Sequence, residues 1–178
     1  MTAHNRWADV LVTGGFIALL VGAIDPLEGS LLILPGSGLV ALGTFLGRGE
    51  RRHKLYRLWV FVLITVGVAA LWGLSAAGGF GGTSGLSIWW GLLVLPYLVG
   101  WVMGILGADS PRWVLWLGIV VGCWYVAIPT LMTMLVSAPS SDGDPAIQIA
   151  QIVIALTGAL TIGGSIYQLR KTNSKINS

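Results

Sequence analysis

The chain has 178 residues, of which 55% are hydrophobic and only 10% are charged, and its formal net charge is +3 at pH 7. Soluble domains carry roughly 25% charged residues, so this composition excludes an ordinary soluble domain and indicates a compact membrane protein. The single cysteine, Cys123, excludes a disulfide framework within the chain.

Long apolar stretches, separated by short loops, follow one another along the chain. A helix needs about 20 mostly apolar residues to span a bilayer. Six stretches qualify, at residues 8–24, 26–47, 56–77, 87–107, 113–137 and 146–168. Because short loops favour antiparallel neighbours, we predict an all-α fold, a polytopic six-transmembrane-helix bundle. It forms a single membrane domain over residues 1–178 with no soluble domain.

Two acids and a proline mark the start of the second stretch, at Asp25, Pro26 and Glu28. A helix start typically has an acid at the N-cap, a proline at the first helical position and an acid at the capping-box position. Both acids also complement the positive end of the helix dipole. We therefore expect Asp25 and Glu28 to cap this span at the outer mouth of the bundle. The functional alternative is an entry site for a cation or a proton.

Helix-breaking residues recur at one depth in three of the spans. Pro35 to Gly38 begin nine residues into the second span, about 13 Å along a helix axis, and Pro96 and Pro129 lie at a similar depth. Irregular backbone at that depth is tolerated only when it is buried in protein or lines a cavity. We predict kinked or broken helices at these prolines, with a mid-membrane pocket or pathway around them; simple proline kinks are the alternative. The candidate pocket residues are Pro35, Gly36, Ser37, Gly38, Pro96, Tyr97, Trp124, Tyr125, Pro129 and Thr130.

Charge predicts the orientation of the chain. With six spans, all ten Lys and Arg residues lie on the side of the N-terminus, whereas the opposite side carries only acids. Because a Lys/Arg excess in short loops marks the cytoplasmic side, we expect a multi-pass protein of the cytoplasmic (inner) membrane with both termini in the cytoplasm. Topology and anionic lipids account for the basic segment from Arg48 to Arg57. Membrane lipids are therefore expected as partners, and nucleic acid is not.

Small residues four positions apart recur in several spans. Such spacing lets helix backbones approach closely in lipid, where no hydrophobic effect drives helices together. Packing within the chain is the simplest use of these faces, and contact with other membrane subunits or self-association is the alternative. The repeats are Gly14, Ala18 and Gly22; Gly43 and Gly47; Gly100 and Gly104; Gly118 and Gly122.

Catalytic groups are not evident in the sequence. The segment Gly82-Thr83-Ser84-Gly85 resembles the GxSG element of rhomboid-type intramembrane serine proteases, but that family needs a histidine on a later span. The only histidines here are His4 and His53, and a serine without a base is not activated. No residue cluster has the spacing of metal or haem ligands. We therefore expect no enzyme activity, no cofactor and no metal.

Two functions fit these features. The first is a non-catalytic accessory or structural subunit of a membrane complex, which needs neither a soluble domain nor intramembrane charge. The second is a channel or facilitator for a small neutral solute, which would use the proline layer. A packed centre at that depth favours the subunit, and a wet cavity favours the channel.

Overall fold

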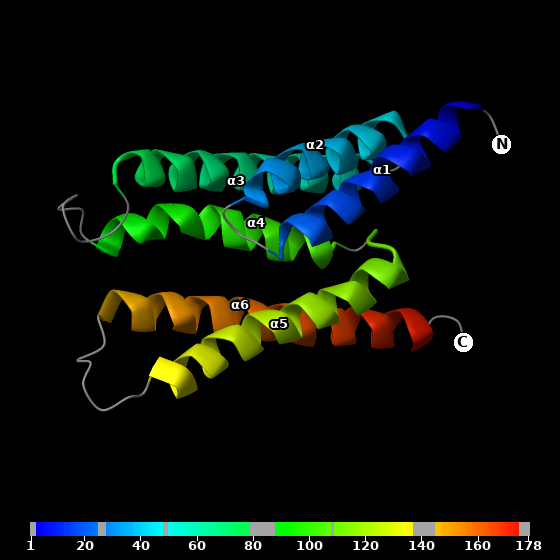
Figure 1. The fold of residues 1–178 in the computed structure, drawn as a ribbon. Helices are drawn as coiled ribbons and strands as arrows, with labels where there is room; N and C mark the ends of the chain where they lie inside the picture. The colour runs from blue at the N-terminus through cyan, green and yellow to red at the C-terminus, as the bar shows by residue number, and fades with distance from the viewer. Residues whose placement is uncertain are drawn as a thin grey trace. The chain divides into compact units, whose positions relative to one another are not determined.

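The computed structural model describes residues 3–24, 28–47, 50–78, 88–107, 109–136 and 145–174. Every regular element in these ranges is helical, which confirms the all-α prediction for the described residues (Figure 1). The elements are α1 (Ala3–Gly22), α2 (Ser30–Leu46), α3 (Arg51–Ala76), the 3-10 helix η2 (Ile88–Val94), α4 (Leu95–Ile105), α5 (Arg112–Val136) and α6 (Pro145–Ser174).

Three of these helices are long and apolar enough to cross a membrane, judged by length and composition. They comprise Arg51–Ala76, Arg112–Leu131 and Gln148–Ser174. The helices Ser30–Leu46 and Trp90–Ile105 are also apolar but shorter.

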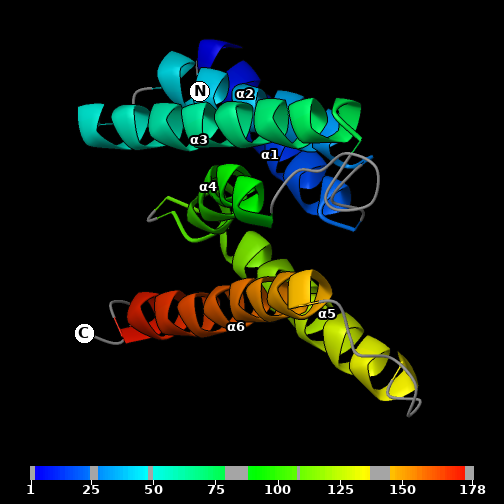
Figure 2. The same ribbon diagram turned by 90° about the vertical axis from the view of Figure 1, so that its left-hand side faces the viewer.

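The chain divides into two compact units, a first unit over Met1–Asp109 and a second unit over Ser110–Ser178. In the first unit, α1 and α2 form an antiparallel hairpin, and α3 packs against both α2 and α4 (Figure 2). A Cβ atom added to Gly15 would lie 2.6 Å from the Gly36 carbonyl oxygen, and one added to Gly43 would lie 2.9 Å from the Ala8 carbonyl oxygen. The backbones of α1 and α2 are therefore in direct contact, as small residues permit.

The start of α2 differs from the predicted one. The helix begins at Ser30, and Gly29 is its N-cap residue, with φ −64° and ψ −19°. The Gly29 carbonyl oxygen lies against α1, because a Cβ atom on Gly22 would be only 2.6 Å from it. Asp25 lies outside the described residues, so its predicted capping role is not tested.

The prolines do not break α2 or α5. α2 continues through Pro35 and α5 continues through Pro129, whereas Pro96 lies in the first turn of α4, directly after η2. A proline removes one backbone donor, but the remaining hydrogen bonds on either side hold the helix together. Near two of the prolines, hydroxyl groups also bond to the preceding turn: Ser37 Oγ donates to the Leu34 carbonyl at 2.8 Å, and Thr130 Oγ1 donates to the Val126 carbonyl at 2.7 Å.

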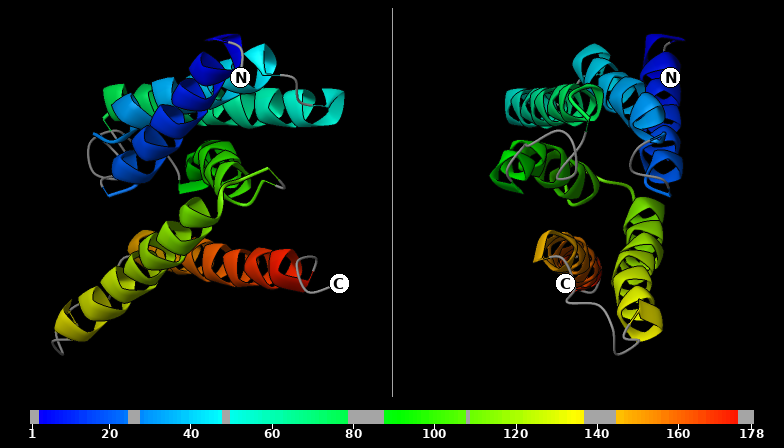
Figure 3. Two further views of the ribbon diagram at one scale, coloured as in Figure 1. Left: turned by 90° about the vertical axis from the view of Figure 1, so that its right-hand side faces the viewer. Right: turned by 60° about the vertical axis from the view of Figure 1, so that its left-hand side comes forward.

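The second unit is an antiparallel hairpin of α5 and α6 (Figure 3). The two helices touch through glycine, because a Cβ atom on Gly122 would lie 2.8 Å from the Gly158 carbonyl oxygen. At the other end of the contact, Arg112 Nη2 donates a hydrogen bond of 2.9 Å to Asn173 Oδ1. The start of α5 is thereby tied to the end of α6.

Candidate functional site

Arg57 is the only charged side chain that is buried among the described residues, with 1% of its surface exposed. It lies in the second turn of α3. Removing a charge from water costs several kcal/mol unless partners compensate for it. The surroundings of Arg57 therefore have to supply acceptors, and they form the candidate site.

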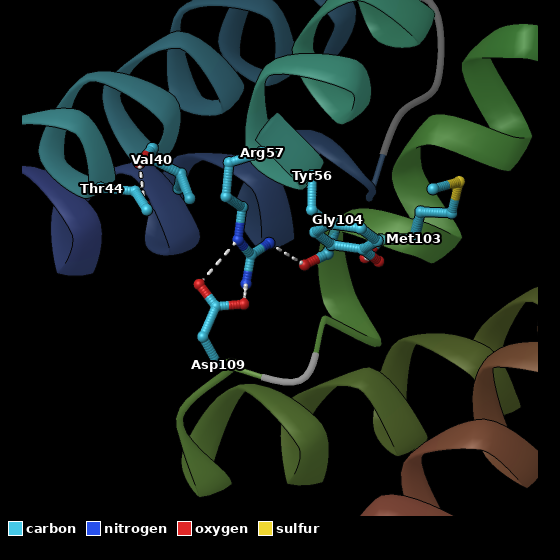
Figure 4. A network of polar contacts seen from close by, with 7 residues as sticks. All are labelled: Val40, Thr44, Tyr56, Arg57, Met103, Gly104 and Asp109. Atoms are coloured by element: carbon cyan, nitrogen blue, oxygen red, sulfur yellow. Dashed lines mark hydrogen bonds and ion pairs between the residues drawn. The ribbon is translucent and has the colours of Figure 1, made fainter. Parts of the chain in front are cut away.

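Each of the three guanidinium nitrogens of Arg57 donates to a protein acceptor (Figure 4). Nη2 lies 2.8 Å from Asp109 Oδ1 and Nε lies 3.1 Å from Asp109 Oδ2, which is the two-pronged geometry that makes Arg–carboxylate pairs strong. Nη1 donates to the Gly104 carbonyl at 2.7 Å. That carbonyl belongs to the last turn of α4, where the helix dipole favours a cation.

Aromatic rings enclose the same guanidinium. Its central carbon lies 5.0 Å from the centroid of the Phe16 ring and 5.7 Å from that of the Tyr56 ring. The Tyr56 hydroxyl in turn donates to the Met103 carbonyl of α4. A Cβ atom on Gly107 would lie 2.6 Å from Arg57 Nη2, so any larger residue there would press on the ion pair. The cluster thus joins α1, α3, the end of α4 and Asp109, all within the first unit.

The charge pattern of the sequence indicates Arg57 only as one of the residues that set the topology, and nothing in it marks Asp109 as a partner. One signal was available, because Arg57 is the only Lys or Arg inside any of the six predicted stretches. A charge inside an apolar stretch indicates a paired or functional group. Its partner, 52 residues further along the chain, carries no comparable signal.

The predicted pocket residues of α2 mostly contact neighbouring helices. Gly36 and Ser37 are buried, whereas Pro35 is exposed. A Cβ atom on Gly36 would lie 2.9 Å from the Ala18 side chain, and one on Gly38 would lie 3.4 Å from the Phe61 ring. This segment therefore forms the contacts of α2 with α1 and α3.

The predicted pocket residues of α4 pack against α3. Tyr97 is 3% exposed, and its backbone nitrogen and Cα approach Gly67 so closely that a Cβ atom there would overlap them. Pro96 is half-buried. Tyr97 therefore lies at the contact between α4 and α3.

The remaining predicted pocket residues belong to the second unit. Tyr125 and Pro129 are buried there, whereas Trp124 and Thr130 are exposed. A Cβ atom on Gly158 of α6 would lie 3.0 Å from Tyr125 Cβ. α5 therefore turns Tyr125 towards its hairpin partner and turns Trp124 outward.

Glu28, the described member of the two predicted outer-mouth acids, is exposed and borders a hollow between α2 and α3. Among the described residues, no group of three or more His, Cys, Asp or Glu side chains is placed to hold a metal ion.

No protein-family model matches the sequence, and no curated protein or solved structure matches the chain.

Proposed function

We propose that this chain is a non-catalytic, six-span subunit that helps to assemble or stabilise a larger complex in the cytoplasmic membrane, with both termini in the cytoplasm. The observation that carries the proposal is backbone contact at the depth where a pathway would run. The backbone of Gly36 in α2 contacts that of Gly15 in α1, and the backbone of Tyr97 in α4 contacts that of Gly67 in α3. Helices that touch through their backbones support a packing role over conduction between them.

The outward surface of α3 suits lipid. The segment from Leu55 to Leu74 has 20 residues and is about 30 Å long at 1.5 Å per residue, which matches the hydrocarbon core of a bilayer. Leu58, Val62 and Val66 are 39%, 39% and 52% exposed along it. In water such a continuous apolar face would be costly, whereas in a bilayer it needs no cover.

The fourth predicted span gains length from its 3-10 segment. η2 has seven residues and α4 has eleven. At rises of 2.0 and 1.5 Å per residue they extend for about 14 and 16 Å. Together they match the roughly 30 Å of a hydrocarbon core, which supports counting this shorter element among six spans.

The described Lys and Arg residues of the first unit lie at one of its two ends. We call the start of α1, the end of α2 and the start of α3 the basic end; Arg6, Arg51 and Arg52 are exposed there. We call the start of α2 and the end of α3 the acidic end, where Glu28 lies near Trp72. A basic end favours the cytoplasmic side of a membrane, which supports the proposed orientation.

Labelling of single cysteines tests the topology. In a Cys123→Ala background, Ser140→Cys is expected to react with a membrane-impermeant maleimide in intact cells, and Ser178→Cys only after lysis, because the proposal places these residues on opposite sides. Mass shift of the purified protein measures the labelling. Equal labelling of both variants in intact cells would refute the orientation.

The same assay separates the subunit from the channel. Ser37 is 2% exposed and follows Gly36, which packs against α1, so Ser37→Cys should resist a small aqueous thiol reagent even after lysis. Ser140→Cys in the same membranes shows that the reagent is active. Rapid labelling of Ser37→Cys would favour an aqueous pathway over the proposal.

Isolation from native membranes tests the subunit role itself. We expect the tagged chain to be recovered at a fixed stoichiometry with another membrane protein, or with itself, in two mild detergents. Gly14→Leu and Gly73→Leu are suitable surface variants, because a Cβ atom at either position meets nothing within 4 Å. If one variant no longer co-purifies with the partner while the other still does, the interface includes the helix face that carries the disruptive substitution. Reproducible recovery of a bare monomer would contradict the proposal.

A further inference from the structure

A hollow of about 400 Å³ lies at the acidic end of the first unit, between the start of α2 and the last turns of α3. Ligand pockets in proteins commonly measure about 300–1,000 Å³, so the hollow is large enough for a small organic molecule. Small side chains on α3 leave this room open. The described residues of its lining are Glu28, Leu31, Trp72, Ser75 and Ala76.

The indole ring of Trp72 is held in place across the two helices. Its Nε1 donates a hydrogen bond of 3.0 Å to Ser30 Oγ on the first turn of α2. Ser30 is fully buried, so this anchor belongs to the packed part of the unit. Half of the Trp72 surface is still exposed. The ring is therefore a fixed aromatic wall of the hollow.

The charge around the hollow favours a cation. Among the described residues, Glu28 is the one charged residue in the lining. The described Lys and Arg residues of the first unit belong to α1 and to the first two turns of α3, away from the last turns of α3 that line the hollow. An aromatic face attracts cations, and recognition of alkylated ammonium groups is its best-known use. Leu31 and Ala76 add apolar surface for the carbon atoms of such a group.

We propose that this hollow binds a small alkylammonium ion, with its alkyl groups on the Trp72 ring and its charge beside Glu28. This binding goes beyond the proposed subunit role and does not depend on it. The same chemistry is offered by a free ion or by the headgroup of a choline lipid, and the experiment separates these two sources.

The indole N–H signals of tryptophan in an NMR spectrum report on the site directly. The full chain, in an uncharged maltoside detergent, is titrated with choline chloride against sodium chloride of equal ionic strength, and Trp72→Phe assigns the Trp72 signal by its disappearance. We expect that signal to move saturably with choline alone. Glu28→Gln should raise the midpoint about tenfold, the loss of one charge-assisted contact.

Glu50→Gln is the matched control, because Glu50 is exposed, lies at the basic end and makes no side-chain cap hydrogen bond. Its midpoint should equal that of the parent chain. An unshifted Trp72 signal in ligand-free Glu28→Gln shows that the Ser30 hydrogen bond persists and that any loss is one of binding.

The lipid arm compares nanodiscs of phosphatidylcholine with nanodiscs of phosphatidylglycerol. A shift of the Trp72 signal in phosphatidylcholine that Glu28→Gln abolishes, without a response to free choline, would support the site with a lipid headgroup as its ligand. The proposal is overturned if the signal moves in neither arm, or if Glu28→Gln and the parent respond equally. Neither result would bear on whether the chain is a subunit.

Discussion

Replacing Gly67 with alanine is expected to lower the free energy of unfolding by about 2–3 kcal/mol, at the upper end of what overpacking a core costs. The added Cβ atom would overlap the backbone nitrogen, Cα and Cβ of Tyr97. A backbone cannot rotate away as a flexible side chain can, so α3 and α4 would have to separate. Their separation would also loosen the buried side chain of Ile64, which lies against Gly100 of α4.

Gly73→Ala provides the control on the same helix. A Cβ atom at Gly73 meets nothing within 4 Å, and alanine is favoured over glycine inside a helix by roughly 0.5–1 kcal/mol. This variant should therefore be neutral or slightly stabilising. Reversible unfolding in mixed micelles, titrated with a denaturing detergent, measures both variants. Equal effects of the two substitutions would show that α3 and α4 do not meet at Gly67.

The glycine contacts show what sequence spacing predicts and what it leaves open. Gly22, Gly43 and Gly122 were expected to face other helices, and a Cβ atom on each would meet a neighbouring helix or turn of its own unit. Gly14 was expected to do so too, yet it faces open space while the adjacent Gly15 makes the contact. Residue spacing identifies a small-residue face, but the rotation of a helix about its axis depends on all of its neighbours.

The same limit applies to the proline layer. Counting residues from a helix end predicts depth, because the rise per residue is constant. It does not predict direction around the axis, and so Tyr125 is buried while its neighbour Trp124 is 51% exposed. The expected breaks at Pro35 and Pro129 are not found, because losing one backbone donor leaves the other hydrogen bonds of the helix in place. Labelling of Ser37→Cys tests whether an aqueous pathway runs past these prolines.

The Arg57–Asp109 pair could not be derived from the sequence, since it joins side chains 52 positions apart. The signal at Arg57 indicates that a partner is needed, but several acids could have provided it. Only the packing of α3 against α4 brings the residue that follows α4 to the guanidinium. The pair is therefore a consequence of the tertiary fold, and it fixes the end of the first unit to α3.

Removing one member of this pair is expected to cost more than removing both. Asp109→Asn leaves a guanidinium that is 1% exposed without its counter-charge. Breaking a buried pair in this way costs about 3–5 kcal/mol, and we expect the lower end, because the Asp109 side chain is itself 26% exposed. The loss should appear as a lower denaturant midpoint in the same mixed-micelle assay.

The double variant Arg57→Met with Asp109→Asn removes the stranded charge. Methionine keeps much of the apolar stem of the arginine side chain, and the main remaining cost is the hydrogen bond from Nη1 to the Gly104 carbonyl. A typical intramolecular hydrogen bond contributes about 0.5–1.5 kcal/mol, so the double variant should be more stable than Asp109→Asn. Losses that simply add between Arg57→Met and Asp109→Asn would mean that the two side chains do not interact. A double variant that recovers stability would instead establish that the unpaired guanidinium causes the loss in Asp109→Asn, which makes the ion pair the link between α3 and the end of the first unit.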